Sequence, residues 1–504
     1  MALVSCCDAL SSALPGNVFL PNSTTYLDAS SQRWSGTASS LWPNCMVLPT
    51  CTEDVATAMQ VLTQNQCLFA VKSGGHMAVA GFNNINDGVT LDLSRLNTVE
   101  QAINLRTTRL GAGAEWQHVY DKTPDVVVPG GLCGGTGVGG VSLGGGMSIF
   151  LAEKGWTANN IIDYEMVLAN GSIVHANQAS NPDLFLALKG GGSNFGVLTH
   201  ITVNNAQLTN LVYAGQVINL LTDRSMSSLL NALTRYTKNN NRDQSAGLQT
   251  IFKLGSNGKD EVETLYGHKV GPASLMPLPF LPPAIFGDLL RVPSQTLAIA
   301  APAPINIMSR IAQAAQADGF RDEIATITFK NDQNTIEAVH TITNDICNQM
   351  ADVPNLDCFW SYVPLPEIVT ANSLKRGGDV LGLDRNRIDR MIVFFSPRWL
   401  DPQYDDRMAN TSVAWFNQAK AATVARGTDD EFLYLNFAGG FQDPISGYGA
   451  KNVEFLRRVA AQYDPQGTAA PGGHDVVELA LSPRYSGERG YYTLLQKDQS
   501  SPES

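Results

Sequence analysis

Short apolar runs and amphipathic stretches alternate along the first 205 residues of the chain. The runs "MVLP", "LFAVKSG", "VTLDLSRL", "TTRLGAGAEW" and "GVLTHITV" lie between polar or glycine-rich segments and predict short strands. In "TEDVATAMQVLTQN", Val55, Met59 and Leu62 recur at helical spacing behind Thr52, a candidate helix cap. "NIIDYEMVLANGSIVHA" predicts a hairpin that turns at residues 170–171, because Asn-Gly favours a two-residue turn. The alternation predicts a mixed α+β fold.

The pattern changes near residue 205, where glycine clusters become fewer and amphipathic stretches become longer. "SMSSLLNALTRYTKNN" and "RIAQAAQA" predict helices, and "RMIVFFSPRWL" predicts a strand that alternates with them. The tail beginning "FLYLNFAGG" predicts a strand, a loop and then a helix with Val453, Leu456, Val459 and Ala460 on one face. A chain of 504 residues is too long for a single core, so two or three domains are expected.

Charge and hydropathy narrow the classes of partner. The net charge is −12 and no basic run occurs, which argues against nucleic acid because phosphate contacts need clustered Lys and Arg. No apolar run reaches the ~18 residues that a membrane-spanning helix needs. The most apolar loop, residues 276–290, contains prolines that break a helix. Neither nucleic acid nor a membrane is an expected partner, and the sequence leaves the oligomeric state open.

Eight cysteines occur without a CxxC motif or a Cys/His spacing typical of metal sites, so no metal is expected. Five of them stand within the first 67 residues, as in disulfide-linked secreted proteins. Several disulfide connectivities remain open at this point. The candidate pairings join Cys6 or Cys7 with Cys45 or Cys67, and Cys347 with Cys358.

Asn-x-Ser/Thr sequons stand at Asn22, Asn170 and Asn410. Together with the clustered cysteines they favour a secreted glycoprotein that folds in the secretory pathway. The N-terminal stretch "MALVSCCDAL" lacks the charged start and the long apolar core of a signal peptide. An intracellular protein, cytoplasmic or vesicular, is therefore the alternative.

The densest glycine cluster is "VPGGLCGGTGVGGVSLGGG", residues 128–146, with ten glycines. Glycine loses much conformational entropy on folding, so such a cluster indicates sharp bends or the close approach of a ligand. Gly135, Gly137 and Gly140 satisfy GxGxxG, and Asp163 follows near the position of a Rossmann acid. "VSLGGGMSIF" is nevertheless a poor first helix, because each central glycine costs about 1 kcal/mol relative to alanine. We therefore expect extended loops whose N–H groups face an anionic ligand.

Two further glycine-rich stretches stand at the ends of predicted elements, "VKSGGHMAVAGF" and "KGGGSNFGVLT". No Gly-Lys-Ser/Thr sequence follows the main cluster, which excludes a P-loop. Three separate backbone sites of this kind predict one large ligand with several polar parts. A dinucleotide fits that description better than a single phosphate.

"SGGHMAVAG" resembles the Arg/Lys-Ser-Gly-Gly-His-x-x-x-x-Gly motif of the FAD-linked oxidases of the vanillyl-alcohol oxidase superfamily, which have a PCMH-type FAD-binding domain. "GGTGVGGVSLGGG", "DLFLALKGGGSNFGVLT" and the tail "YLNFAGGFQDP" are similar to the berberine bridge enzyme-like branch, in a fungal-type variant. The resemblance covers about residues 40–205 and 430–470. It implies FAD as the cofactor.

The resemblance also implies the architecture: a two-lobed FAD-binding domain, and a substrate domain in which helices cover an antiparallel sheet. An N-terminal segment spans residues 1–40, and the FAD-binding domain spans 41–205. The substrate domain spans 206–430. Residues 431–504 return to complete the FAD-binding domain.

The resemblance assigns roles to individual residues. It implies that His76 is joined to the 8α-methyl of the flavin. Cys133, four residues before Gly137, matches the cysteine that bonds carbon 6 of the flavin in a subset of the family, although Cys-Gly-Gly-Thr here replaces Cys-Pro-Thr-Val. A free buried thiol is the alternative. Tyr434 and Asn436 match a Tyr-x-Asn strand at the flavin face and are the candidate catalytic pair. The other implied cofactor-binding positions are Ser73, Gly74, Gly75, Gly81, Pro129, Gly130, Gly131, Leu132, Gly137, Gly139, Gly140, Gly144, Gly145, Asn159, Ile161, Asn194, Gly196 and Val197.

Other polar residues are weaker candidates. The family's plant members have a glutamate base in the middle domain, but "FFSPRWLDPQ" offers only Arg398 and Asp401 in that region. The remaining histidines stand on ordinary mixed stretches, and surface or packing roles are expected for them: His118, His175, His200, His268, His340 and His474.

The function that the resemblance implies is an FAD-dependent oxidase. It would take a hydride from an alcohol or an activated C–H bond of a small molecule, a secondary metabolite, and reduce O₂ to H₂O₂. Two alternatives stay open: a carbohydrate (oligosaccharide) oxidase, and a flavoprotein cyclase that guides a cycloaddition.

Overall fold

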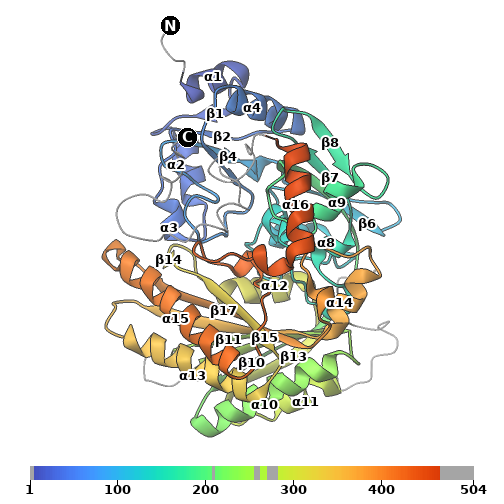
Figure 1. The fold of residues 1–504 in the computed structure, drawn as a ribbon, viewed down its shortest axis with the longest axis vertical. Coiled ribbons are helices and arrows are strands. Elements are labelled where there is room, and N and C mark those ends of the chain that lie inside the picture. Colours follow the sequence, from blue (N-terminus) through green and yellow to red (C-terminus); the bar gives the residue numbers. More distant parts are fainter. Residues whose placement is uncertain (1–4, 207–210, 255–260, 270–281, 466–504) are drawn as a thin grey trace, which may run out of the picture.

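The computed structural model describes residues 5–206, 211–254, 261–269 and 282–465 (Figure 1). They form a four-stranded, a five-stranded and an eight-stranded sheet, with helices on the sheet faces. The α+β fold predicted from the sequence is confirmed. His474 and residues 276–281 of the apolar loop lie outside the described residues. In the part of the chain that is described, no helix is long and apolar enough to cross a membrane.

The two smaller sheets contain the strands predicted before residue 205. In the four-stranded sheet, β2, β4 and β3 run parallel; the five-stranded sheet is antiparallel. The predicted hairpin is confirmed: β7 and β8 pair and turn at Asn170 and Gly171. The strands are β1 Val18–Phe19, β2 Cys45–Val47, β3 Phe69–Lys72, β4 Val89–Asp92, β5 Val99–Gln101, β6 Thr107–Gly111, β7 Ile161–Val167, β8 Ile173–Ala176 and β9 Val197–Asn204.

The predicted helix after residue 51 is α4, Thr52–Gln64, and Val55, Met59 and Leu62 are buried as expected. The prediction that Thr52 caps this helix is wrong. Cys51 takes the cap position without a side-chain hydrogen bond, and the Thr52 hydroxyl instead donates to Glu165 at 2.5 Å.

The main glycine cluster contains a short helix, α6 Val138–Leu143, where extended loops were expected. The helix ends at Gly144 instead of running through the three glycines, and Gly145 and Gly146 have positive φ angles of 104° and 81°. Gly144, Gly145 and Gly146 therefore terminate this helix, while Gly139 and Gly140 lie inside it.

The eight-stranded antiparallel sheet has the order β13-β10-β12-β11-β16-β17-β14, and β15 also pairs with β17. Alternate residues of its strands serve two cores. On β16, Trp360 and Tyr362 pack with α10 (Asp223–Asn240), α13 (Gln333–Gln349) and α15 (Asp405–Ala425), whereas Val363 and Leu365 belong to the core of the smaller sheets. The strands are β10 Leu211–Leu220, β11 Ala246–Lys253, β12 Glu261–Lys269, β13 Gln295–Pro304, β14 Arg321–Asp322, β15 Ala325–Lys330, β16 Asp357–Leu365 and β17 Arg390–Trp399.

Helices α10, α13 and α15 cover the sheet face that lies away from the smaller sheets (Figure 1). The opposite face of the sheet is turned toward the smaller sheets and bounds the site described below. The remaining α-helices are α1 Cys6–Ala13, α2 Thr24–Ser31, α3 Gly36–Ser39, α5 Trp116–Lys122, α7 Leu151–Lys154, α8 Thr157–Asn160, α9 Pro182–Ala187, α11 Gly287–Leu290, α12 Ile305–Ala314, α14 Glu367–Leu374 and α16 Ala450–Tyr463.

The C-terminal part of the described chain crosses back to the smaller sheets, where α16 packs against α9 (Figure 1). Val453, Leu456 and Val459 are buried on the predicted helix face. The strand predicted at "FLYLNF" is absent: Tyr434 lies in extended backbone before a 3₁₀ turn, Leu435–Phe437. Within the described ranges this segment pairs with no strand, and a side-chain hydrogen bond from Asn436 joins it to the glycine cluster.

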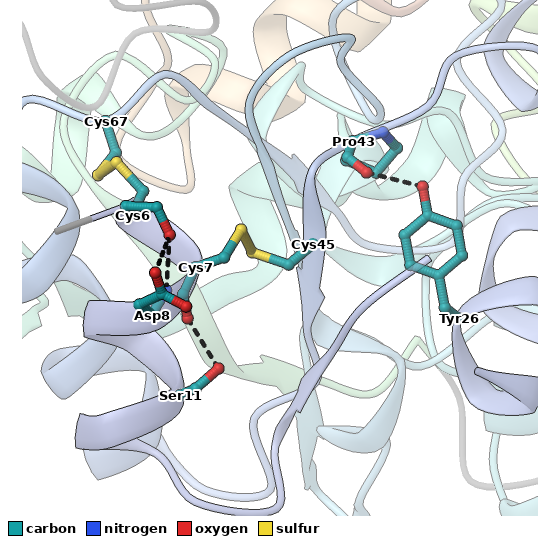
Figure 2. The surroundings of a disulfide bond; sticks show 9 residues. Cys6, Cys7, Asp8, Ser11, Tyr26, Pro43, Cys45 and Cys67 are labelled. Atoms are coloured by element: carbon teal, nitrogen blue, oxygen red, sulfur yellow. Dashed lines mark hydrogen bonds between the residues drawn. A yellow bond between two sulfur atoms is a disulfide. The ribbon is translucent and has the colours of Figure 1, made fainter. Parts of the chain in front are cut away.

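Three disulfides join the cysteines: Cys6–Cys67, Cys7–Cys45 and Cys347–Cys358. Figure 2 shows the two that hold α1: Cys7–Cys45 joins it to β2, and Cys6–Cys67 joins it to the segment between α4 and β3. These pairings lie within the set left open by the sequence. Cross-links of this kind stabilise the fold mainly by restricting the unfolded chain. Among the described residues, Cys51 and Cys133 are the free cysteines.

Candidate active site

A cavity of about 1610 Å³ lies between the smaller sheets and the eight-stranded sheet. All three glycine-rich stretches and the C-terminal turn reach it. The predicted residues that line it are Ser73, Gly74, Gly75, His76, Gly131, Leu132, Cys133, Gly137, Gly139, Gly140, Gly144, Asn194, Gly196, Val197, Tyr434 and Asn436.

Six predicted positions do not line the cavity: Gly81, Pro129, Gly130, Gly145, Asn159 and Ile161. Packing accounts for two of them. A Cβ atom on Gly130 would lie 2.0 Å from the Trp116 ring, so this glycine permits the ring to pack. The Asn159 amide donates to the Gly378 carbonyl at 3.1 Å and accepts from the Trp156 N–H at 2.8 Å. It fixes the local backbone.

Two glycine loops interlock at the floor of the cavity. A Cβ on Gly74 would lie 2.5 Å from the Gly137 nitrogen, and one on Gly137 would lie 2.2 Å from the Gly74 nitrogen. Only residues without side chains allow this approach. Gly140 differs, because a Cβ there would meet nothing within 4 Å. The side of Gly140 on which a Cβ would stand therefore faces the open cavity.

The cavity walls fit a bound polar group. Asn194 is 5% exposed; its amide donates to the Gly191 carbonyl at 2.7 Å, but its Oδ1 is buried without a hydrogen-bond partner. A buried acceptor in this state indicates a missing donor. Together with the open side of Gly140, it fits the ribityl, ribose or base groups of a dinucleotide. In the described ranges, no group of His, Cys, Asp or Glu side chains is arranged to hold a metal ion.

His76 and Cys133 meet in this cavity from different loops. The Nε2 atom of His76 lies 3.7 Å from the Sγ of Cys133. Burial, with a smaller contribution from the Arg398 charge, lowers the pKa of His76 to about 4, so its imidazole is neutral. Burial raises the pKa of Cys133 to about 12, and its thiol donates to Gln313 Oε1 at 2.9 Å. The imidazole of His76 and the thiol of Cys133 are therefore both uncharged.

Tyr434 and Asn436 are brought together at the end of α6. The Asn436 amide donates to the Tyr434 hydroxyl at 3.0 Å and to the Val141 carbonyl at 3.3 Å. Burial raises the pKa of Tyr434 well above its usual range, although hydrogen bonds from Asn436 and two backbone N–H groups oppose this. Gly144 leaves room for the amide, since a Cβ there would lie 2.0 Å from Asn436 Oδ1.

The cavity wall formed by the eight-stranded sheet was not predicted from the sequence. Gln249 and Ile251 on β11, Phe359 and Ser361 on β16, and Phe394 on β17 face the cavity at alternate positions. The ring centroids of Phe359 and Phe394 are 5.7 Å apart. The period of two was visible in the sequence, but it could not show which face of the sheet lines the site.

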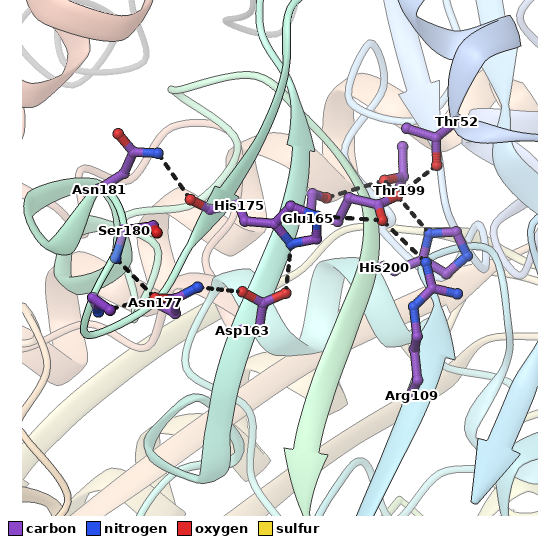
Figure 3. Close-up of polar contacts among 11 residues, drawn as sticks. Thr52, Arg109, Asp163, Glu165, His175, Asn177, Ser180, Asn181, Thr199 and His200 are labelled. Atoms are coloured by element: carbon purple, nitrogen blue, oxygen red, sulfur yellow. Dashed lines mark hydrogen bonds and ion pairs between the residues drawn. The ribbon is translucent and has the colours of Figure 1, made fainter. Parts of the chain in front are cut away.

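The weaker candidates lie elsewhere. Arg398 is fully buried in ion pairs with Asp322 and Asp357, and Asp401 caps a 3₁₀ turn; neither lines the cavity. His175 and His200 lie on the five-stranded sheet beside Asp163 and Glu165 (Figure 3). Like His118, His268 and His340, they lie outside the cavity.

Comparisons with known proteins agree with this geometry. The profile of a family described as "FAD binding domain" matches residues 43–177. A FAD-dependent monooxygenase of Aspergillus calidoustus is 32% identical over 95% of this chain and 92% of its own length. A berberine bridge enzyme-like protein of Physcomitrella patens has a similar fold, with a TM-score of 0.75, 16% identity and coverage of 94% of this chain and 99% of that one. A chitooligosaccharide oxidase gives a TM-score of 0.73 at 17% identity, covering 93% and 99% of the two chains.

Proposed function

The chain belongs to the FAD-linked oxidoreductases of the vanillyl-alcohol oxidase superfamily, in the berberine bridge enzyme-like branch, and from this premise we propose its reaction. It takes a hydride from an alcohol or an activated C–H bond of a small secondary metabolite and passes the electrons to O₂, giving H₂O₂. The observation that carries this proposal is the convergence of three glycine loops, His76, Cys133 and Tyr434 on one cavity. When bound, FAD supplies the hydride acceptor.

The cofactor is held covalently in this proposal. His76 and Cys133 reach the cavity 3.7 Å apart, and the 8α-methyl and carbon 6 lie on the same ring of the flavin. Attachment to His76 retains the cofactor and raises its reduction potential. A second bond to Cys133 would replace the hydrogen bond that its thiol now donates to Gln313. Residues 41–205 and 431–504 form the proposed FAD-binding domain, and residues 206–430 the proposed substrate domain.

Tyr434 is the proposed proton-transfer residue. Its hydroxyl accepts a hydrogen bond from Asn436, and its pKa is raised by burial, so the phenol is protonated before substrate binds. Removal of the substrate hydroxyl proton therefore needs the N–H groups around Tyr434 to stabilise its phenolate. Asn436 holds the Tyr434 hydroxyl in position through the hydrogen bond that its amide donates, and this hydrogen bond also favours the phenolate.

The wall provided by the eight-stranded sheet supports a flat, largely apolar substrate. Phe359, Phe394 and Phe437 form a row, with ring centroids 5.7 and 4.7 Å apart. The cavity lining also includes polar side chains, such as Gln249, Ser361 and Gln442, which could bind the polar groups of a substrate. Carbohydrate oxidation and flavin-assisted cyclisation remain the two alternatives to metabolite oxidation.

Anaerobic mixing with candidate substrates separates these functions. A redox enzyme bleaches its flavin absorbance with the true substrate and forms H₂O₂ when air is admitted. We expect this with aromatic alcohols or polycyclic phenols and not with oligosaccharides. Bleaching by oligosaccharides alone would support the carbohydrate alternative, and product formation without bleaching would support a cyclase.

A secretory route is also proposed. The side chains of Asn22, Asn170 and Asn410 are exposed, and three disulfides are present. A loss of mass on treatment of the natively expressed protein with an endoglycosidase would support this route. An unchanged mass, with free thiols at Cys6 and Cys7, would contradict it.

A further inference from the structure

We propose that Trp34 and Arg398 are positioning residues for His76: they form a layered stack that holds the imidazole for its attachment to the flavin. The proposal rests on the proposed function in one respect, namely that His76 carries the flavin. It assigns a role to two residues from outside the glycine loops. Trp34 comes from the N-terminal segment and Arg398 from β17 of the eight-stranded sheet.

The three side chains lie one above another. The rings of Trp34 and His76 are 4.5 Å apart and only 8° from parallel. The guanidinium carbon of Arg398 lies 5.0 Å from the centroid of the Trp34 ring. Stacking restricts the rotation of the imidazole, which has no hydrogen-bonded carboxylate partner within the described residues. The indole thus performs the orienting task that a carboxylate performs for many functional histidines.

Trp34 is itself fixed by the backbone on both sides. Its N–H donates to the Gly75 carbonyl at 3.2 Å, directly before His76, and its carbonyl accepts from the Gly319 N–H at 2.9 Å. The side chain is 5% exposed and lines the cavity. A residue held this way links the histidine loop to the segment before β14, and the ring position is set by both.

Arg398 is held even more firmly. It is fully buried, its Nε donates to Asp322 at 2.7 Å, and its Nη1 donates to Asp357 at 3.2 Å. The guanidinium carbon also lies 4.6 Å from the centroid of the Phe320 ring. A planar guanidinium stacks on aromatic rings in a way that an ammonium group does not. The charge also disfavours a proton on His76.

The stack matters for the bond-forming step. Attachment forms a bond between an imidazole nitrogen and the 8α carbon, and it breaks one N–H and one C–H bond. The two protons and two electrons pass to O₂, giving one H₂O₂ for each flavin attached. The imidazole must offer a nitrogen lone pair in a fixed direction. The groups that face His76 are Arg398 behind the indole and the Cys133 thiol at 3.7 Å, and neither accepts its proton as a carboxylate would.

The test measures how much flavin each variant retains after acid precipitation, in a Cys133→Ala background so that only His76 can hold it. Trp34→Leu removes the aromatic face, Trp34→Phe keeps one, and Trp42→Leu is the matched control. Trp42 stands in the same N-terminal part of the chain, but it is 56% exposed and stacks on Tyr26. We expect Trp34→Leu to retain at least fivefold less covalent flavin, Trp34→Phe to recover most of it, and Trp42→Leu to match the parent.

Arg398→Lys, which keeps the charge but loses the planar fork, should give an intermediate loss and serves as the second variant if Trp34→Leu does not fold. A folded Trp34→Leu or Arg398→Lys protein that binds FAD and retains as much of it as the parent would overturn the proposal. Complete release of FAD from the parent itself, with the flavin still bound before precipitation, would instead contradict covalent attachment to His76. The two failures are thus distinguishable.

Discussion

Two groups of histidines have opposite surroundings in this protein. On the five-stranded sheet, His200 Nδ1 lies 2.9 Å from Glu165, and His175 Nδ1 lies 2.8 Å from Asp163 (Figure 3). His76, at the large cavity, faces an indole ring and a thiol. The first arrangement satisfies the imidazoles and can stabilise the fold. The second leaves a neutral ring with a nitrogen available for a new bond, which is what a cofactor attachment site needs.

The carboxylate at the centre of the first group has many partners. Glu165 accepts hydrogen bonds from Thr52 at 2.5 Å and Thr199 at 2.8 Å, besides its contacts with His200 and Arg109. These donors come from α4, β9 and β6, so one side chain ties three elements to β7. The hydrogen bond from His200 is the largest of the effects that hold the Glu165 pKa far below its usual range. The cluster is therefore interpreted as structural.

Among the substitutions that test the difference between the two groups of histidines, His76→Ala should have the largest effect. In the Cys133→Ala background, we expect the protein to release essentially all of its flavin on acid precipitation, because no other linkage remains. His200→Ala, the matched control in the same background, should retain its flavin and lose stability instead. Retention by His76→Ala, or release by His200→Ala, would remove the distinction between the two groups.

Tyr434→Phe should lower kcat about 100-fold, because it removes the proposed proton-transfer group. This corresponds to a rise of ~2.7 kcal/mol in the activation free energy. Flavin retention should not change, since only the hydroxyl contacts to Asn436 and nearby N–H groups are lost. Tyr164→Phe is the control: Tyr164 is fully buried on β7 and does not line the cavity. Stopped-flow reduction of the flavin measures the step directly, and an unchanged rate in Tyr434→Phe would exclude this role.

Glu165→Gln should lower the free energy of unfolding by about 2 kcal/mol, because charge-assisted hydrogen bonds to a largely buried carboxylate become neutral ones. Covalent flavin should stay at the parent level. Chemical denaturation with matched acid-precipitation measurements checks both statements. Loss of flavin without loss of stability would show that this cluster belongs to the cofactor site after all.

A smaller effect should appear in the pH dependence of the same pair of proteins. The folded pKa of Glu165 is lowered, so its stabilising contribution is complete above the unfolded value, about 4.5, and disappears as the pH falls through the folded value. The stability difference between the parent and Glu165→Gln should shrink as the pH falls below about 4.5, because Glu165 then becomes protonated. A difference that grows as the pH falls below about 4 would have the wrong sign.

Local sequence patterns were sufficient for the elements whose causes are local. The Asn170-Gly171 turn and the buried face of α16 were predicted because a turn type and a helical period are set by neighbouring residues. The strand expected at Tyr434 and the extended loops expected over residues 138–143 were wrong. Both depend on a contact between segments about 290 residues apart, where Asn436 fills the space above Gly144.

The residues of the candidate site likewise fall into two groups, those with a local sequence signal and those without one. The glycine loops and His76 were found from motifs, since each loop contains its own signal. Trp34, Gln313 and the row of Phe359 and Phe394 were not found, because they enter from distant segments. Nothing near Trp34 in the sequence shows that Gly75 and Gly319 hold its backbone.

The central claim is that the large cavity holds FAD through His76. Proteolysis of the denatured wild-type protein, followed by mass spectrometry of the yellow peptides, tests it most directly. The account predicts a flavin-bearing peptide that contains His76, alone or cross-linked to the peptide of Cys133. An unmodified His76 peptide in full yield, from protein that had bound its flavin, would contradict it.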